Sequence, residues 1–273
     1  MGESEPEGAL PVNHILTEID GPLGIVTLNN PDKHNAFDDV LIAELTAALR
    51  KLDANAEVRA VILSAVGKSF SAGADLNWMK RMAGYSEEEN LRDALGLAEL
   101  MRSLHGMSKP TIARVHGPAY GGGVGLVACC DMAVGTLAAT FSLSEAKLGL
   151  IPAVISPYVI AAIGERAAHR YFLTAERFDA GEAYRLGLLH ELAQSDEEMD
   201  DKINDLVTAL MGCGPNAIAE GKRLIAAVAN RPIDEKVITE TAQRIARVRA
   251  SDEGKEGVKA FLDKRKARWV VEN

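Results

Sequence analysis

The sequence has few aromatic residues, few cysteines and no long apolar run. Aromatic residues make up 5% of the 273 positions, which is too few for the stacking platforms that bind single-stranded nucleic acid. The formal net charge of −9 at pH 7 also argues against nucleic acid or an acidic membrane surface as the main partner. No apolar segment approaches the roughly 20 residues that a membrane-spanning helix needs. We therefore expect a protein that binds neither nucleic acid nor membrane.

The three cysteines fit neither a metal site nor a disulfide framework. Cys129 and Cys130 are adjacent and Cys213 is distant in sequence, so the spacing of metal-ligand pairs is missing. Residues 1–9 are acidic and polar, without the basic and apolar regions of a secretory signal or the arginines of a mitochondrial one. We predict reduced, buried thiols and a cytoplasmic location.

The pattern of apolar residues predicts an α/β core followed by helices. Residues 14–29 alternate polar and apolar side chains around Asp20-Gly21, which is typical of a β-hairpin. Ser86 and Glu89 form a capping box at the start of a helix that runs to about His105. Further helices are predicted at 36–52, 215–228, 233–250 and 253–269, and strands at 60–64, 111–115, 132–135 and 140–143. We predict a disordered acidic tail (1–10), an α/β core (11–197) and a helical region (198–273).

A glycine-rich turn follows the apolar strand at 111–115. Gly121, Gly122, Gly123 and Gly125 open a second apolar run that reads as a buried helix. Such a turn presents unpaired N–H groups beside the positive end of the helix dipole. The dinucleotide fingerprint is incomplete, because Leu126 replaces its last glycine, and the P-loop pattern is missing. Taken alone, the turn fits close packing of a helix on a sheet as well as it fits an anion site.

A second turn of small residues has the same design. Residues 71–75 (Ser-Ala-Gly-Ala-Asp) follow a buried strand and precede a helical segment. Two such turns can converge, each directing one backbone N–H at the same oxygen. That arrangement is an oxyanion hole, in which loss of one side-chain donor costs ~2.7–4 kcal/mol of barrier.

Three segments together resemble the enoyl-CoA hydratase/isomerase (crotonase) family, over residues 14–269. They are 70–76 (Phe-Ser-Ala-Gly-Ala-Asp-Leu), 120–126 (Tyr-Gly-Gly-Gly-Val-Gly-Leu) and 141–152 (Phe-Ser-Leu-Ser-Glu-Ala-Lys-Leu-Gly-Leu-Ile-Pro). The resemblance implies an α/β fold of the crotonase-like (ClpP-type) kind, a spiral of ββα units with a C-terminal helical region. It also implies a homo-oligomer, either a trimer or a hexamer of paired trimers.

The resemblance further implies an acyl-CoA thioester substrate, with coenzyme A as part of the substrate and no separate cofactor. The two oxyanion donors correspond to the backbone N–H groups of Ala74 and Gly122, and the acid/base residue to Glu145. A positioned carboxylate can accept the proton of a water molecule or deliver one to carbon. The implied reaction is addition or removal of water across the C2=C3 bond.

Gly125 departs from the family pattern, because typical hydratases carry a second glutamate at that position. Three alternatives follow. Glu145 serves as both base and acid, or the enzyme is a Δ3-Δ2 enoyl-CoA isomerase, or the space at Gly125 accommodates a branched, acidic substrate. A non-catalytic CoA-binding relative is the alternative from another functional class.

Residues 148–159, 163–166 and 171–179 favour the branched substrate. They resemble the bacterial 3-methylglutaconyl-CoA hydratases of leucine breakdown and relatives that act on longer branched glutaconyl-CoAs. The free carboxylate of such a substrate needs a cation, and the candidates are Lys80, Arg81 and His116, although solvated or structural roles are more usual for such side chains.

Contacts with the CoA portion follow from the same resemblance. Lys33 and His34 correspond to residues near the adenine–phosphate end, and Asn77 replaces a lysine of some relatives. Phe261 and Lys264 resemble a segment that reaches the CoA of a neighbouring subunit, where a lysine would act as a point charge for phosphate. The remaining expected substrate contacts are Ala72, Asp75, Leu76, Gly121 and Gly125.

Overall fold

The computed structural model describes residues 13–270, so the acidic tail expected at 1–10 lies outside the described residues. Its centre is a six-stranded sheet with the order β1-β2-β3-β4-β6-β9. β1 and β2 pair antiparallel as a hairpin, and the other neighbouring strands run parallel. The strands are β1 (Ile15–Asp20), β2 (Leu23–Leu28), β3 (Ala60–Ala65), β4 (Thr111–Val115), β6 (Met132–Thr136) and β9 (Glu191–Ala193).

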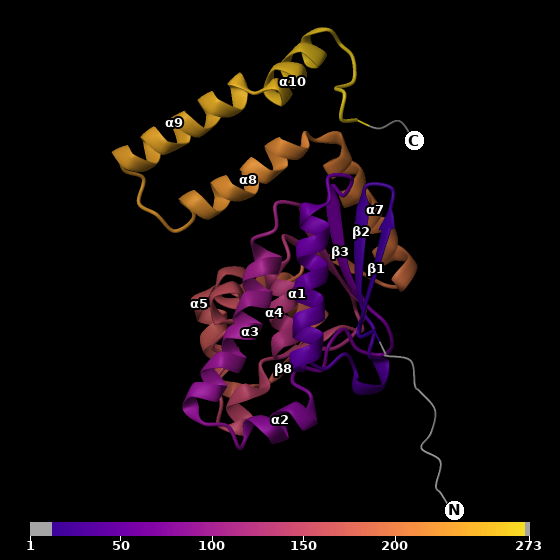
Figure 1. Ribbon diagram of the computed structural model, residues 1–273, viewed down its shortest axis with the longest axis vertical. Coiled ribbons are helices and arrows are strands. Elements are labelled where there is room, and N and C mark those ends of the chain that lie inside the picture. Colours follow the sequence, from indigo (N-terminus) through magenta and orange to yellow (C-terminus); the bar gives the residue numbers. More distant parts are fainter. Residues whose placement is uncertain (1–12, 271–273) are drawn as a thin grey trace, which may run out of the picture.

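Helices cover both faces of this sheet (Figure 1). Ala113 and Val115 of β4 belong to the main apolar core, which also takes in buried residues of α1 (Asp39–Ala54), α3 (Glu87–His105) and α4 (Gly122–Cys129). Ile112, the residue before Ala113, points the other way and packs with residues of α7 (Asp196–Gly212). A parallel sheet buried on both faces is the arrangement that unbroken apolar strands require.

A smaller sheet connects the glycine-rich turn to the segment that contains Glu145. β5 (Ala119–Tyr120) pairs parallel with β7 (Thr140–Ser142), which pairs antiparallel with β8 (Arg177–Asp179). α4 begins directly after β5, and a short 3₁₀ helix (Ser144–Leu148) begins directly after β7. Since parallel strands end at the same edge, the start of α4 and Glu145 come to the same side of the molecule.

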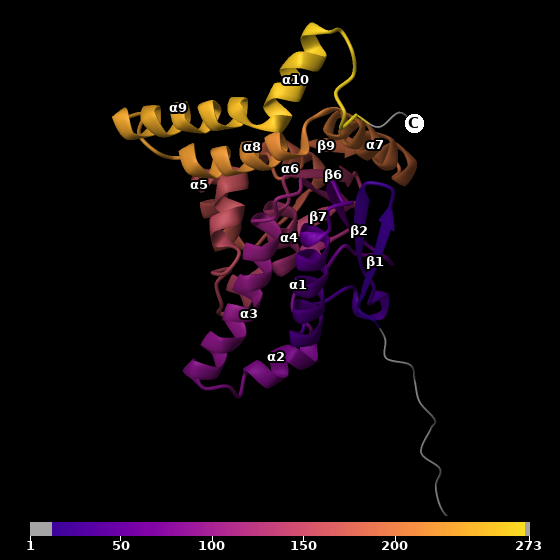
Figure 2. The same cartoon turned by 45° about the horizontal axis from the view of Figure 1, so that its top comes forward.

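The C-terminal helices lie at the opposite end of the molecule from α2 (Leu76–Met82), as Figures 1 and 2 both show. They are α8 (Pro215–Val228), α9 (Glu235–Ala250) and α10 (Asp252–Leu262). Several large apolar side chains of these helices and of the loop between α8 and α9 are exposed, which are Ile225, Ile233, Ile238, Ile245, Val258, Phe261 and Leu262. Among residues 13–270, no helix is both long and apolar enough to cross a bilayer.

Most predicted elements are present with shifted ends. The hairpin around Asp20-Gly21 is confirmed, as is the capping box of Ser86 and Glu89, in which both reciprocal hydrogen bonds form. The helix predicted at 215–228 has those bounds. The expected boundary between residues 197 and 198 falls inside α7, which packs on the sheet.

The C-terminal half differs from the sequence-based expectation in three respects. Strands β8 and β9 were not predicted, because three residues are too few to show a strand period. The helix predicted at 253–269 ends at Leu262, and Lys264 adopts left-handed backbone at φ 55°. Cys129 and Cys130 are buried as expected, but Cys213 at the end of α7 is exposed, so the prediction that it is buried is wrong.

Candidate active site

The two small-residue turns lie in direct contact. Gly73 and Gly121 both have positive φ, at 87° and 50°. A Cβ added to Gly73 would lie 3.1 Å from the carbonyl oxygen of Tyr120, and one added to Gly121 would lie 3.9 Å from Cα of Gly73. Glycine is therefore needed at both positions, for its backbone conformation and, at Gly73, for close approach to the other turn. The sequence-based expectation that the turns converge agrees with this contact.

The peptide unit between Gly73 and Ala74 is held by its carbonyl oxygen. The amide of Phe37 donates to that oxygen across 2.6 Å. Because C=O and N–H of a trans peptide point in opposite directions, the N–H of Ala74 points away from Phe37. Within residues 13–270 no group accepts a hydrogen bond from this N–H, and Ala74 is exposed. The donor is thus oriented and available.

The peptide unit between Gly121 and Gly122 is held in the same way. Its carbonyl oxygen accepts hydrogen bonds from the amides of Val124 at 3.0 Å and Gly125 at 3.3 Å, in the first turn of α4. The N–H of Gly122 therefore points outward from the start of this helix, where the helix dipole adds positive potential. In the described part of the chain it has no acceptor either. Two oriented and unpaired donors thus come from two turns in contact.

Glu145 reaches the same place from the other sheet. One carboxylate oxygen, Oε1, lies 3.1 Å from the point that a Cβ on Gly121 would occupy. The other oxygen, Oε2, is buried and has no hydrogen-bond partner among the described residues. Burial raises the pKa of Glu145 and outweighs a hydrogen bond from the residue's own backbone. A partly desolvated carboxylate without a partner is suited to exchanging protons with a bound molecule.

The space expected at Gly125 does not exist, so this expectation is wrong. Gly125 is buried in α4, and a Cβ added to it would lie 2.9 Å from Cβ of Ile155 and 3.3 Å from Cε of Met101. The methyl group Cγ2 of Ile155 would be closer still. An apolar side chain therefore fills the direction in which the family's second glutamate would project. No substrate branch can enter there unless Ile155 moves.

Asp75 begins α2 and ties it to Lys33. Its Oδ1 accepts from the amides of Asn77 at 2.8 Å and Trp78 at 3.0 Å, which caps the helix. Its Oδ2 lies 3.1 Å from Nζ of Lys33. Burial acts to raise the pKa of Asp75, but hydrogen bonds from the Trp78 amide, Lys33 and the Asn77 amide outweigh it and lower the pKa. In this structure Asp75 has a structural role beside the two donors.

The other expected substrate contacts differ in their surroundings. His34 has left-handed backbone, and its Nδ1 lies 3.0 Å from Oγ of Ser69. Ala72 and Leu76 are exposed next to the Ala74 turn. Phe261 lies in α10 and Lys264 follows just after it, and α10 is at the opposite end of the molecule from α2 (Figure 2). The fold therefore does not bring them to the site of their own chain.

The three candidate cations for a substrate carboxylate differ in the partners that they have. Lys80 is exposed on α2. Arg81, on the same helix, forms an ion pair with Asp39. His116 instead lies 2.9 Å, through Nε2, from the carbonyl oxygen of Gly67. Of the three, Lys80, in the last turn of α2, is the one that has no hydrogen-bond or ion-pair partner among residues 13–270.

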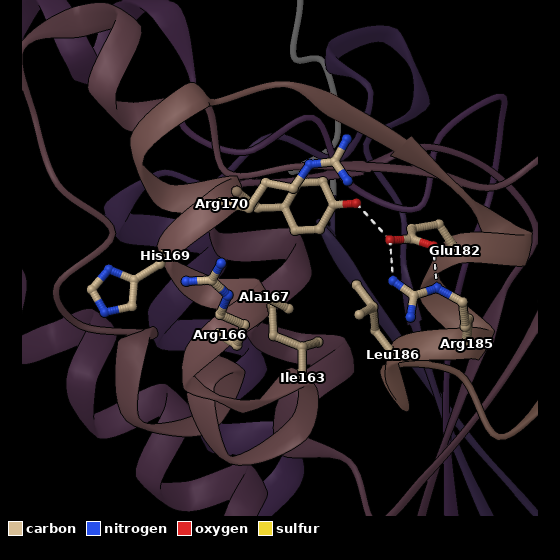
Figure 3. Close-up of a pocket in the computed structure, with 9 residues that line it drawn as sticks. Ile163, Arg166, Ala167, His169, Arg170, Glu182, Arg185 and Leu186 are labelled. Carbon is tan, nitrogen blue, oxygen red and sulfur yellow. Dashed lines mark hydrogen bonds and ion pairs between the residues drawn. The ribbon is translucent and has the colours of Figure 1, made fainter.

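A cavity of about 660 Å³ lies elsewhere, between α5 (Ser156–Thr174) and α6 (Ala180–Leu186) (Figure 3). None of the expected site residues lines it. Two of its arginines already have acidic partners, since Arg185 pairs with Glu182 and Arg170 with Glu176. The cavity does not contribute to the chemistry of the two donors and Glu145.

Sequence reasoning missed two residues that shape the site, Phe37 and Ile155. The sequence placed Phe37 only inside the helix predicted at 36–52, although its backbone is hydrogen-bonded to the turn that contains Ala74. The sequence around Ile155 does not predict its position, because an isoleucine before a helix can face either a core or a binding site. Only the packing of α5 against α4 reveals its position.

Comparisons with known proteins agree on one family. The sequence pattern described as Enoyl-CoA hydratase/isomerase matches residues 18–272. The crystal structure of an enoyl-CoA hydratase from Shewanella pealeana is similar with a TM-score of 0.92 and 44% sequence identity, covering 95% of this chain and 97% of that chain. Pseudomonas aeruginosa AtuE has a TM-score of 0.90 and 32% identity, covering 95% and 100%. The crotonyl-CoA hydratase of Syntrophomonas wolfei is 30% identical over 262 residues, 94% of this chain and 98% of the relative.

Proposed function

The chain belongs to the enoyl-CoA hydratase/isomerase family, and we propose that it adds water to the C2=C3 bond of an enoyl-CoA thioester, or removes it in the reverse direction. Its fold is the crotonase-like α/β fold, as similarity to the solved relatives shows. Curated relatives include a crotonyl-CoA hydratase and a short-chain-enoyl-CoA hydratase. The chain is accordingly an enzyme of the crotonase family.

One observation supports this function above the others. The amides of Ala74 and Gly122 lack acceptors in the described chain, and they belong to turns that touch each other and Glu145. A thioester oxygen between the two N–H groups would be stabilised most when it carries negative charge. Preorganised donors at developing charge are usually the largest contribution to catalysis.

The proposed hydration uses Glu145 for both proton transfers. The oxygen of a water molecule forms a bond to C3 while Glu145 takes one of its protons. The electron pair of the C2=C3 bond moves toward the thioester, and the charge on the thioester oxygen is held by Ala74 and Gly122. Glu145 then returns the proton to C2, which completes a syn addition of one water molecule. The scheme requires no cofactor beyond the CoA that the substrate carries.

The runner-up is a Δ3-Δ2 enoyl-CoA isomerase, and the packing at Gly125 favours keeping it. Ile155 fills the space into which a second carboxylate at position 125 would project. Glu145 is therefore the one glutamate proposed for proton transfer. In this reaction Glu145 takes a proton from C2 and returns it to C4, while the same two amides hold the enolate. No bond to water forms.

For the substrate we propose a branched glutaconyl-CoA such as 3-methylglutaconyl-CoA. The support is the resemblance of residues 148–159, 163–166 and 171–179, since the argument from space at Gly125 has failed. Lys80 is the proposed partner of the free carboxylate, because Arg81 is paired with Asp39. Its helix α2 begins two residues after Ala74.

We also propose that the enzyme is a cytoplasmic homo-oligomer, a trimer or a hexamer. The support is the set of exposed apolar side chains in the C-terminal region, among which Phe261 of α10 is 82% exposed and Ile233, between α8 and α9, is 88% exposed. Apolar surface of this kind is typical of an interface. In such an assembly Phe261 and Lys264 would serve the CoA site of a neighbouring subunit.

A substrate panel in heavy water tests the function. With 3-methylglutaconyl-CoA and crotonyl-CoA, we expect deuterium at C2 and a hydroxyl group from solvent at C3. Deuterium in the product without a new hydroxyl group would identify the isomerase. Tight binding of both thioesters without isotope incorporation would identify a non-catalytic CoA-binding protein.

A further inference from the structure

Phe37 contacts both of the turns that carry the unpaired amides. It follows β2 and precedes α1 in the chain, far in sequence from either turn, and it is 1% exposed. We propose that Phe37 is the positioning residue that sets the direction of the Ala74 donor and its separation from the Gly122 donor. This inference rests on the proposed function.

The backbone of Phe37 fixes the direction of the first donor. Its N–H donates to the carbonyl oxygen of Gly73 at 2.6 Å, and its own carbonyl oxygen accepts from the amide of Asp75 at 2.7 Å. These two bonds hold the chain on both sides of Ala74, in an isolated parallel bridge between Phe37 and Ala74. The peptide that contains the Ala74 N–H cannot rotate without breaking the first bond.

The ring of Phe37 fixes the position of the second donor. A Cβ added to Gly122 would lie 3.0 Å from Cε2 and 3.2 Å from Cδ2 of the ring. The ring therefore packs against Cα of Gly122, at the first residue of α4. Interiors are packed as densely as organic crystals, so a ring in this place acts as a spacer.

One buried residue thus connects two donors that come from separate units of the fold. Oxyanion stabilisation depends on donors at 2.7–3.1 Å from the charged oxygen, so a small change in their separation lowers the rate. Removal of the ring keeps both backbone bonds and leaves a cavity beside Gly122. The expected defect is in the transition state rather than in the binding of CoA.

The test is Phe37→Leu beside a matched control, Leu49→Ala. Leu49 is fully buried in the same core, but it lies in the last two turns of α1, away from both donors. We expect both variants to unfold at lower temperature. Phe37→Leu should lose about tenfold or more in kcat, as a mispositioned oxyanion donor does, with KM near the wild-type value, and Leu49→Ala should keep its kcat.

A binding measurement gives a readout that does not depend on turnover. The probes are a saturated acyl-CoA thioester and the matching thioether, which lacks the carbonyl oxygen. Phe37→Leu should weaken binding of the thioester several-fold and leave binding of the thioether unchanged. Equal losses for both probes, or a kcat loss in Leu49→Ala as large as in Phe37→Leu, would show that Phe37 only supports the core.

The two proposals can fail separately. If wild-type protein binds thioester and thioether equally and turns over no enoyl-CoA, the proposed function is wrong. If wild-type protein passes these tests and Phe37→Leu behaves like the control, only the inference about Phe37 is wrong.

Discussion

At the scale of single residues, Glu145 determines what the site can do. Its Oε2 is buried and has no hydrogen-bond partner within residues 13–270, although buried carboxylate oxygens normally find a donor. An unpaired group of this kind costs stability and is retained where it has a function. The sequence identified Glu145 through a family motif, but not through its surroundings, because a lone glutamate in a polar turn is usually solvated.

Glu145→Gln should remove the proton transfers and keep the binding site. We expect kcat to fall by about 10²–10⁴-fold, the usual contribution of a general acid or base, with acyl-CoA affinity nearly unchanged. In the wild type, the hydration rate should rise with pH through a pKa above the ordinary 4.5 of a glutamate, since burial raises it. Steady-state kinetics against pH checks this, and a variant with wild-type rates would remove Glu145 from the mechanism.

Glu145→Gln should lower activity but raise the stability of the folded protein at neutral pH. A raised pKa means that the folded protein binds the proton more tightly than the unfolded chain does. Stability therefore falls as pH rises from 4.5 through the folded-state pKa, and stays lower above it. Glu145→Gln should be more stable than wild type at pH 7 and no more stable below pH 4.5. Urea unfolding at the two pH values measures this, and an equal difference at both would contradict the raised pKa.

Gly125→Glu should destabilise the fold rather than install a second catalytic carboxylate. Its Cβ would collide with Ile155, and overpacking of a core typically costs about 1–3 kcal/mol. The loss should be smaller when Ile155→Ala is present, because that change removes the colliding methyl groups. Urea unfolding of both single variants and the double variant tests the contact. A Gly125→Glu variant as stable as wild type would mean that Ile155 moves aside at little cost and that position 125 can accommodate a side chain.

At the scale of secondary-structure elements, local rules predicted helices well and short strands poorly. The capping box at Ser86 and the proline-led helix at 215–228 are encoded by neighbouring residues. Strands β8 and β9 exist because three-residue segments find open edges beside β7 and β6. Such strand pairing depends on residues that are distant in sequence, so no pattern within the three-residue segment predicts the strand.

The attachment of α8 to the core depends on one lysine. Nζ of Lys222 lies 2.6 Å from Oδ2 of Asp131 and 2.9 Å from the carbonyl oxygen of Lys109, and the side chain is 16% exposed. The same Oδ2 accepts from the amide and hydroxyl of Thr111 at the start of β4. α8 is therefore bonded directly to the chain at the N-terminal ends of β4 and β6, two inner strands of the large sheet.

Lys222→Met should loosen α8 and cost about 1.5–3 kcal/mol of unfolding free energy, the usual contribution of a hydrogen bond to a charged group. Faster hydrogen exchange should be confined to α8–α10. Lys255→Met, at an exposed lysine of α10, is the control and should change neither. Uniformly faster exchange throughout the protein would indicate that α8 does not open separately.

At the scale of the whole molecule, the two ends differ in the kind of surface that they present. The site lies near α2, and the exposed apolar helices α9 and α10 lie at the opposite end (Figure 2). The family resemblance predicted a C-terminal helical region, and the structure contains it. How copies assemble is a property of two surfaces together, so a single sequence cannot determine it.

Mixing two variants with different defects tests whether Lys264 serves a neighbouring subunit. Lys264→Ala should weaken CoA binding, more so at low salt, and Glu145→Gln should be inactive. When the two variants are unfolded and refolded together, about one site in four should combine an intact Glu145 with an intact Lys264 from another chain, by random assembly of a ring. Activity of the mixture above the sum of the separate variants is expected, and no gain would place Lys264 outside the neighbouring site.

The proposed mechanism depends most on the backbone N–H groups of Ala74 and Gly122, which act together on one thioester oxygen. Infrared difference spectroscopy of a bound saturated acyl-CoA, with ¹³C in the thioester carbonyl, observes that oxygen directly. We predict that the carbonyl stretch moves to a lower frequency than in water, because two donors polarise the bond. A stretch at or above its frequency in water would contradict the oxyanion hole.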